Sequence, residues 1–82
     1  MTEQEAVAAA TKALPAHKLP GEATAQSAEL HWIELKEGDP DQPGPVRDAK
    51  AWVVRFALGE RALAELAVDD GTGKVVRVER FR

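Results

Sequence analysis

The sequence has few of the residues from which small proteins build chemical sites. It contains no cysteine and only two histidines among 82 residues, which excludes a disulfide framework and a cysteine-ligated zinc and leaves little for any other transition-metal site. Basic residues are not in excess either, because 11 Lys and Arg stand against 14 Asp and Glu, so nucleic-acid binding is not expected. We expect no cofactor, and a core held by side-chain packing alone.

Long apolar runs are missing as well. No run approaches the roughly 20 residues of a membrane-spanning helix, so we predict no membrane span. The first ten residues carry two acids and no base, whereas a signal peptide starts with positive charge. If Met1 is the natural start, this pattern predicts a cytoplasmic protein, and otherwise the compartment stays open. The length of 82 residues suits one domain, residues 1–82, which buries about 60% of the surface of its unfolded chain.

The N-terminal segment predicts a helix. Thr2 followed by Glu5 is a capping-box pattern, in which the hydroxyl and the carboxylate each accept a hydrogen bond from a backbone N–H of the first turn. Pro15 should end the helix, because it lacks an N–H and disfavours helical geometry at the residue before it. A helix of about 12 residues is marginal alone and must pack against another element. Its apolar face consists of Val7, Ala10 and Leu14, with Ala6, Ala9 and Ala13 beside them.

Segments rich in β-branched and aromatic residues predict strands at 30–35, 51–58, 61–68 and 75–80. Gly59-Glu60 suits a two-residue type II′ hairpin, in which glycine supplies the positive φ. Residues 15–27 have no sustained period and are expected as a connector. Residues 38–48 contain three prolines, which cannot donate to a sheet ladder, and are expected as an exposed loop.

The third of these segments is ambiguous. Residues 61–68 could also form one or two helical turns, since Ala, Leu and Glu favour helix. We favour a strand because Gly59 and Gly71 bracket the segment too closely for a useful helix. The sequence therefore predicts an α+β domain, with an N-terminal helix packed on a four-stranded antiparallel meander sheet.

Three stretches of the chain resemble one known family. Val68-Asp69, followed by Thr72-Gly73 and Lys74-Val75, resembles the hairpin of the PepSY domain, a small non-catalytic module attached to peptidase propeptides and many bacterial surface proteins. The opening helix at residues 5–10 and the strand Trp-Val-Val-Arg-Phe at residues 52–56 are also similar. The resemblance implies a helix on an antiparallel sheet, and a role in binding or restraining a peptidase or another protein domain. It implies no catalytic residues, and the family is often exported.

The turn before the last strand is expected to be structural rather than a metal site. It consists of Asp69, Asp70, Gly71, Thr72 and Gly73. Aspartate side chains can cap such a turn, and glycine tolerates left-handed geometry. A calcium-binding EF-hand loop needs Glu at its twelfth position, whereas counting from Asp69 that position is Arg80.

No set of residues predicts an active site. His31 with Ser27 four residues before it suggests a nucleophile and a base. Catalysis would also need the two side chains within hydrogen-bond reach and a third group to orient the base, which is improbable in so short a chain. We therefore expect a non-enzyme, in which His31 is an exposed strand position.

The predicted sheet is apolar on both sides, which one short helix cannot cover. Strict alternation places on the helix side Trp52, Val54, Phe56, Leu66, Val76 and Val78. It places on the other side Ile33, Leu35, Val53, Leu63 and Val75. This second face is expected to meet a protein partner or a second copy in a weak homodimer, or to be covered by residues 15–27 or 38–48. The candidate partner surface is Ile33, Leu35, Val53 and Leu63.

Two functions remain open from the sequence. The first is a non-catalytic protein-binding or regulatory module, including PepSY-like restraint of a peptidase. The alternative is a small-ligand carrier with a pocket between helix and sheet, near Trp32 and Trp52.

Overall fold

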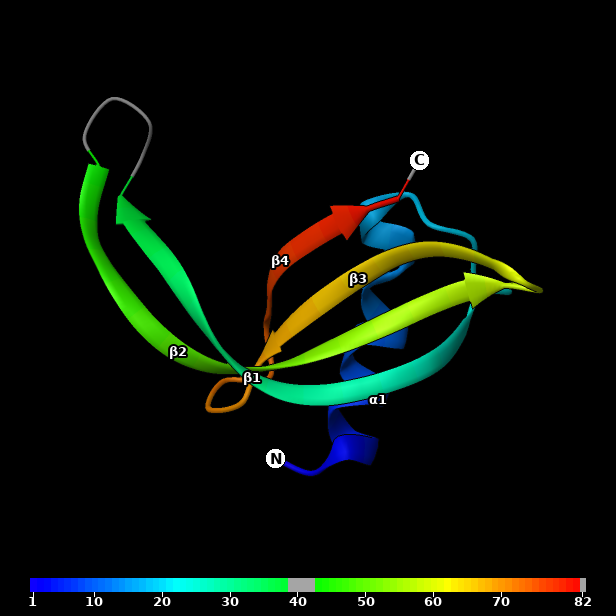
Figure 1. Cartoon of the computed structure of the whole chain (residues 1–82), viewed down its shortest axis with the longest axis horizontal. Coiled ribbons are helices and arrows are strands. Elements are labelled where there is room, and N and C mark those ends of the chain that lie inside the picture. The colour runs from blue at the N-terminus through cyan, green and yellow to red at the C-terminus, as the bar shows by residue number, and fades with distance from the viewer. Residues whose placement is uncertain (39–42, 82) are drawn as a thin grey trace.

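The computed structural model describes residues 1–38 and 43–81. Helix α1 (Glu3–Ala13) and a short 3-10 helix (Pro15–His17) precede four strands, β1 (Thr24–Gly38), β2 (Pro43–Leu58), β3 (Arg61–Asp69) and β4 (Val75–Arg80). The strands form one antiparallel sheet in the order β1-β2-β3-β4, and α1 lies behind it in Figure 1. The predicted α+β meander is confirmed, including the strand at residues 61–68. Within the described residues, no helix is both long and apolar enough to cross a membrane.

Helix α1 begins and ends where the sequence predicts. The Thr2 hydroxyl accepts from the Glu5 N–H at 3.1 Å, and the Glu5 carboxylate accepts from the Thr2 N–H at 2.9 Å. These bonds lower the pKa of Glu5, chiefly through the Thr2 backbone N–H. The 3-10 helix starts at Pro15, and the helix packs through Ala6, Ala10 and Leu14, all fully buried.

The main core lies between α1 and the sheet. Val54 and Phe56 from β2 and Leu66 from β3 are at most 1% exposed, and they pack beneath Ala10 and Leu14 of the helix. Small alanines on the helix allow the backbone to approach these larger side chains closely. Leu19 and Ala23, from the connector after the helix, close the same side of the sheet.

Strands β1 and β2 are longer than predicted. β1 has 15 residues and β2 has 16. The first half of β2 has no pairs with β3, since the β2–β3 pairing begins at Ala51. The expectations of a connector at 24–27 and of a loop at 43–48 are therefore wrong, while residues 39–42 lie outside the described part. Pro45 is tolerated because, among the described strands, this part of β2 pairs with β1 and not with β3. A register shift between Lys36 and Gly38 of β1 lies nearby. We call residues 32–38 and 43–50 the arm; it rises to one side in Figure 1.

Two register irregularities move three side chains to the face opposite the predicted one. Leu63 lies in the irregularity between the pairs Phe56/Ala64 and Ala57/Ala62, and it packs on the helix-side core. Val76 lies in the second irregularity, so Val75 packs on the helix side and Val76 on the other. An extra residue in one strand inverts the alternation beyond it. The predicted sides of these three residues are wrong.

The β2–β3 turn has the expected geometry. Gly59 has φ +63°, in the left-handed region that glycine adopts more easily than residues with a side chain. Glu60 does not share a positive φ, as a type I′ turn would require. Gly59 therefore supplies the positive φ that joins β2 to β3.

Candidate functional site: the open face of the sheet

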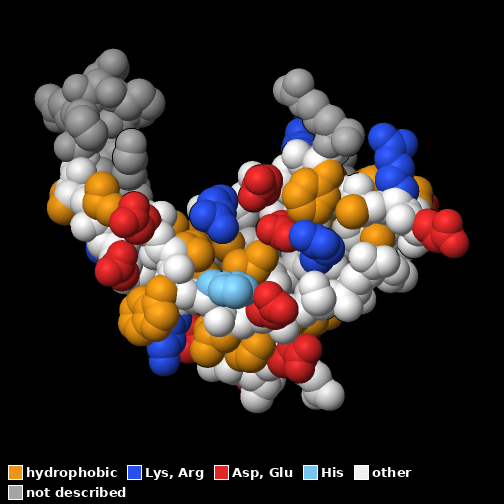
Figure 2. Space-filling model, viewed as in Figure 1, with side chains coloured by type: hydrophobic (Ala, Val, Ile, Leu, Met, Phe, Trp, Pro, Cys, Tyr) orange, Lys and Arg blue, Asp and Glu red, His pale blue; other side chains and the backbone are white. Residues whose placement is uncertain are grey.

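The face of the sheet opposite α1 is the candidate site, and we call it the open face. It faces the viewer in Figure 2, where acidic and basic side chains lie among hydrophobic ones. The connector residues Leu19 and Ala23 pack on the helix side, so the predicted cover by residues 15–27 does not form. In the part of the chain that the structure describes, no helix lies over the open face.

The floor of this face is apolar and made mainly of small side chains. Ile33, Ala51 and Ala67 form a buried cluster, with Ile33 at 8% exposure, and Leu35, Val53 and Val76 pack against it half-buried. The alanines on β2 and β3 extend only a short way from the sheet, whereas longer side chains surround them. A hollow of about 800 Å³ on this face shares Ile33 and Val53 with the cluster. Its lining comes from all four strands: Ser27, Glu29, His31, Trp32, Ile33, Glu34, Val53, Arg55, Glu65 and Arg77.

Charged side chains on the border of the hollow pair across and along the strands. Arg55 on β2 binds Glu65 on β3, with the guanidinium Nη2 2.9 Å from the carboxylate, and it also lies over the Phe81 ring at 5.4 Å. The His31 ring nitrogen Nε2 lies 2.9 Å from a Glu29 carboxylate oxygen on the same strand. These pairs are exposed, so each contributes little to stability. They give the hollow a border with both signs of charge.

The residues that suggested a catalytic pair do not meet. Ser27 and His31 lie on the same face of β1 four residues apart, which is about 13 Å along a strand. Glu29 stands between them and takes the hydrogen bond of His31. The His31 side chain is 51% exposed, as predicted for an open strand position.

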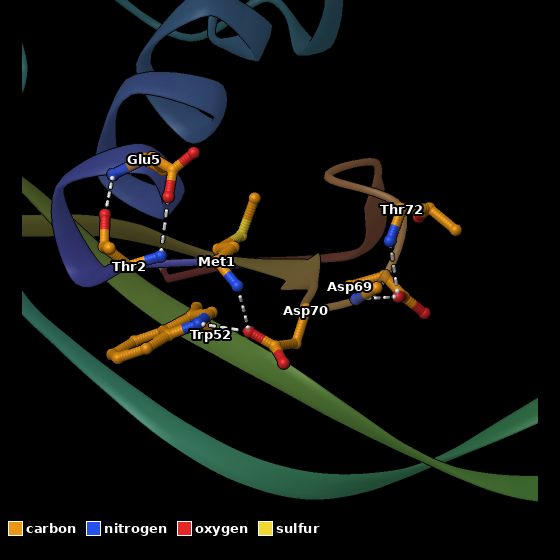
Figure 3. A network of polar contacts seen from close by, with 8 residues as sticks. Met1, Thr2, Glu5, Trp52, Asp69, Asp70 and Thr72 are labelled. Carbon is orange, nitrogen blue, oxygen red and sulfur yellow. Dashed lines mark hydrogen bonds and ion pairs between the residues drawn. The ribbon is translucent and has the colours of Figure 1, made fainter.

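The β3–β4 turn is held by its own aspartates, as Figure 3 shows. One oxygen of Asp69 accepts from the backbone N–H groups of Gly71 and Thr72, at 2.8 and 3.0 Å. Asp70 leaves the turn and accepts from the indole N–H of Trp52 at 2.9 Å and from the Met1 amino group at 3.3 Å. The Trp52 hydrogen bond is the main cause that lowers the pKa of Asp70. Asp69 therefore caps the turn as expected, whereas Asp70 ties the turn to β2 and to the start of the chain.

The main core lies between helix and sheet, where the carrier alternative places its pocket. Trp52 is half-buried beside α1 and is held by Asp70, and the space next to it is occupied by Val54 and Phe56. Trp32 is 68% exposed on the arm, where the Lys50 ammonium lies 5.5 Å from its ring centre. Trp32 lines the hollow of the open face, whereas Trp52 packs against the helix-side core.

Three of the four residues predicted as a partner surface come together. Ile33, Leu35 and Val53 belong to the apolar cluster of the open face, and Leu63 belongs to the helix-side core. Sequence reasoning missed the alanines of the floor, because alanine carries little hydrophobic signal. It also missed Arg55, Glu65 and Arg77 as a border, although their alternation with apolar residues along β2, β3 and β4 was a usable signal.

Comparison with family models and with curated proteins, and comparison with solved structures, gave no match.

Proposed function

We propose that this chain is a non-catalytic protein-binding module, and that the open face is its binding surface. The observation that carries this proposal is the hollow of about 800 Å³ on the sheet face that α1 leaves uncovered, in which Ile33 and Val53 of the apolar cluster lie among charged side chains. Protein interfaces commonly have an apolar centre and a polar rim. PepSY-like restraint of a peptidase is the specific form of this role that the sequence resemblance favours.

The residues that line the hollow indicate which kind of partner segment could bind there. Ile33 and Val53 in its lining, next to the alanines of the apolar cluster, can receive a medium-sized apolar side chain of a partner. The Arg77 guanidinium on β4 and the Glu29 carboxylate on β1 stand at opposite borders of the same row of the sheet, through the pairs Glu29/Val53, Val53/Ala67 and Ala67/Arg77. A partner segment with an apolar centre, an acid toward β4 and a base toward β1 would match this row.

The test places a photo-activated cross-linking amino acid at Val53, and a control at Lys50, which points to the opposite side of β2. Proteins from native lysate that cross-link at Val53 and not at Lys50 are then purified. Calorimetry measures their binding to the wild-type chain, to Val53→Arg and to the control Lys50→Glu. We expect Val53→Arg to weaken binding at least about tenfold and Lys50→Glu to leave it unchanged. Circular dichroism checks that both variants fold.

Two results would contradict the proposal. One is equal binding by Val53→Arg and wild type, since the partner would then use another surface. The other is substrate turnover by the purified chain that is lost in His31→Ala, which would make the protein an enzyme. If the partner is a peptidase, inhibition of its activity by the added chain tests the PepSY-like form of the role.

A further inference from the structure

In the part of the chain that the structure describes, the outer edge of β1 is a long strand edge without a partner strand. β1 is the first strand in the sheet order, and it pairs with β2 on its other side. Folded proteins usually protect such edges with proline, lysine or bulges, because the free N–H and C=O groups can pair with another strand. Between Ser27 and Leu35, β1 contains no proline, no lysine and no register shift. The opposite edge of the sheet, β4, has only six residues.

This unprotected edge also carries exposed apolar side chains. Leu30 is 43% exposed and Trp32 is 68% exposed, and they alternate with Glu29 and His31. Leu30 points to the helix side of the sheet, since it pairs with Trp52, whereas Trp32 pairs with Lys50 on the arm and lies at the border of the hollow. Glu29 and His31 point to the open face. Both faces of this edge therefore have a defined chemistry.

The edge is complementary to itself in one antiparallel register. A two-fold axis perpendicular to the sheet keeps each face on its own side, so a residue must pair with one an even number of positions away. Centring the axis on Leu30 pairs Leu30 with its copy, Glu29 with His31 of the copy, and Ala28 with Trp32 of the copy. Centring it on Glu29 opposes two carboxylates, and centring it on His31 opposes two imidazoles. Of these three registers, the one centred on Leu30 places a carboxylate opposite an imidazole that can donate a hydrogen bond to it, and we therefore select it.

We infer that a second copy of this chain pairs with β1 in that register, which joins two four-stranded sheets into one continuous sheet. Both α1 helices then lie on one side, and both open faces lie side by side on the other. A single edge buries less area than the roughly 1,600 Å² of a standard interface, so we expect a dimer of micromolar affinity. The dimer and the proposed partner both contact Glu29 at the border of the hollow, but the dimer pairs the β1 edge and leaves Val53 uncovered, so that Val53→Arg tests the partner separately.

The first experiment measures the mass of the full chain by sedimentation across about 1–500 μM. We expect dimerisation of the wild type, and a loss of affinity of at least about tenfold in Leu30→Arg, which brings two guanidinium groups together at the axis. Leu58→Arg is the matched control, because Leu58 is 44% exposed, close to the 43% of Leu30, and lies at the far end of β2. A wild type that stays monomeric throughout this range overturns the inference.

The second experiment tests the register. Glu29→Lys alone should weaken the dimer, since lysine would face His31 of the copy, and the double variant Glu29→Lys with His31→Glu should restore it. Leu30→Cys should form a disulfide dimer under mild oxidation, because opposed residues in antiparallel strands have Cα atoms about 4.5–5.5 Å apart, within disulfide range. The chain has no other cysteine to compete.

Other occupants of this edge give different results. If the double charge variant does not recover and Leu58→Cys cross-links as readily as Leu30→Cys, then the copies meet through another surface and the inference is wrong. If the chain is monomeric but a cross-linked partner requires Leu30, then β1 receives a strand of a different protein, and self-pairing is likewise refuted. Because Val53→Arg leaves the β1 edge intact, failure of the open-face proposal would leave the dimer unchanged.

Discussion

Truncation of Leu66 tests which face of the sheet contributes more to the free energy of unfolding. Leu66 is fully buried on β3, between Val54 on β2 and Val78 on β4, beneath the helix. Leu66→Ala removes buried methyl groups and leaves a cavity, a change that costs about 3–4 kcal/mol at such sites. A domain of 82 residues has a free energy of unfolding of about 4–12 kcal/mol, so the variant should keep only part of its stability.

The control for this experiment is Val53→Ala on the open face. Val53 is half-buried there, and its truncation should cost about 1 kcal/mol. Urea denaturation followed by circular dichroism measures both variants, and thermal melting should show a loss of about 12–30 °C for Leu66→Ala. Equal losses for the two variants would refute the reasoning, because the open face would then carry as much of the core as the helix side.

The remaining predictions concern the cap and the turns. Thr2→Ala removes the capping bond and should cost about 1 kcal/mol in urea denaturation, with a loss of helix signal; no change would mean that the capping box is not formed in solution. Gly59→Ala should cost about 1–2 kcal/mol because of its positive φ, whereas Gly21→Ala, at an open position without positive φ, should be neutral; equal effects would contradict the turn geometry. The lowered pKa of Asp70 means that its ionised form stabilises the fold above the unfolded-state pKa of about 3.9, and that this contribution is lost as pH falls through the lower folded-state value. Asp70→Asn should therefore lower stability at neutral pH and flatten the loss of stability as pH falls below the unfolded-state value of about 3.9; an unchanged slope would exclude this role.

Local signals in the sequence were sufficient for most of the fold. The capping box at Thr2 and Glu5 and the proline at residue 15 set the helix bounds, and Gly59 set the β2–β3 turn, because each acts through its immediate neighbours. The length of β1 and β2 could not be predicted in this way. Alanine, glutamine and proline have little strand preference, and pairing between residues far apart in sequence decided their conformation.

The candidate site was predicted in part for the same reason. Ile33, Leu35 and Val53 share a face because strict alternation holds between them. Leu63, Val75 and Val76 changed sides because of two bulges, and a bulge depends on how two strands match, which no single segment records. The charged border could have been found from alternation, whereas the alanine floor needed the neighbouring strands to be placed first.

The arm has a consequence for how the protein opens. Among the described residues, residues 43–49 of β2 pair with β1 and with no other strand. Lys50 also accepts a backbone hydrogen bond from Asp70, and residues 51–58 are held between β1 and β3 and lie under the main core. A two-stranded ribbon is marginally stable in water, and local opening needs less free energy where fewer buried contacts must break. Amide hydrogens along β2 should therefore exchange with solvent faster from 46 to 49 than from 52 to 57. The two halves of β2 thus belong to two cooperative units of different stability. The strand pairing in the arm can break and re-form while the helix and the rest of the sheet stay folded.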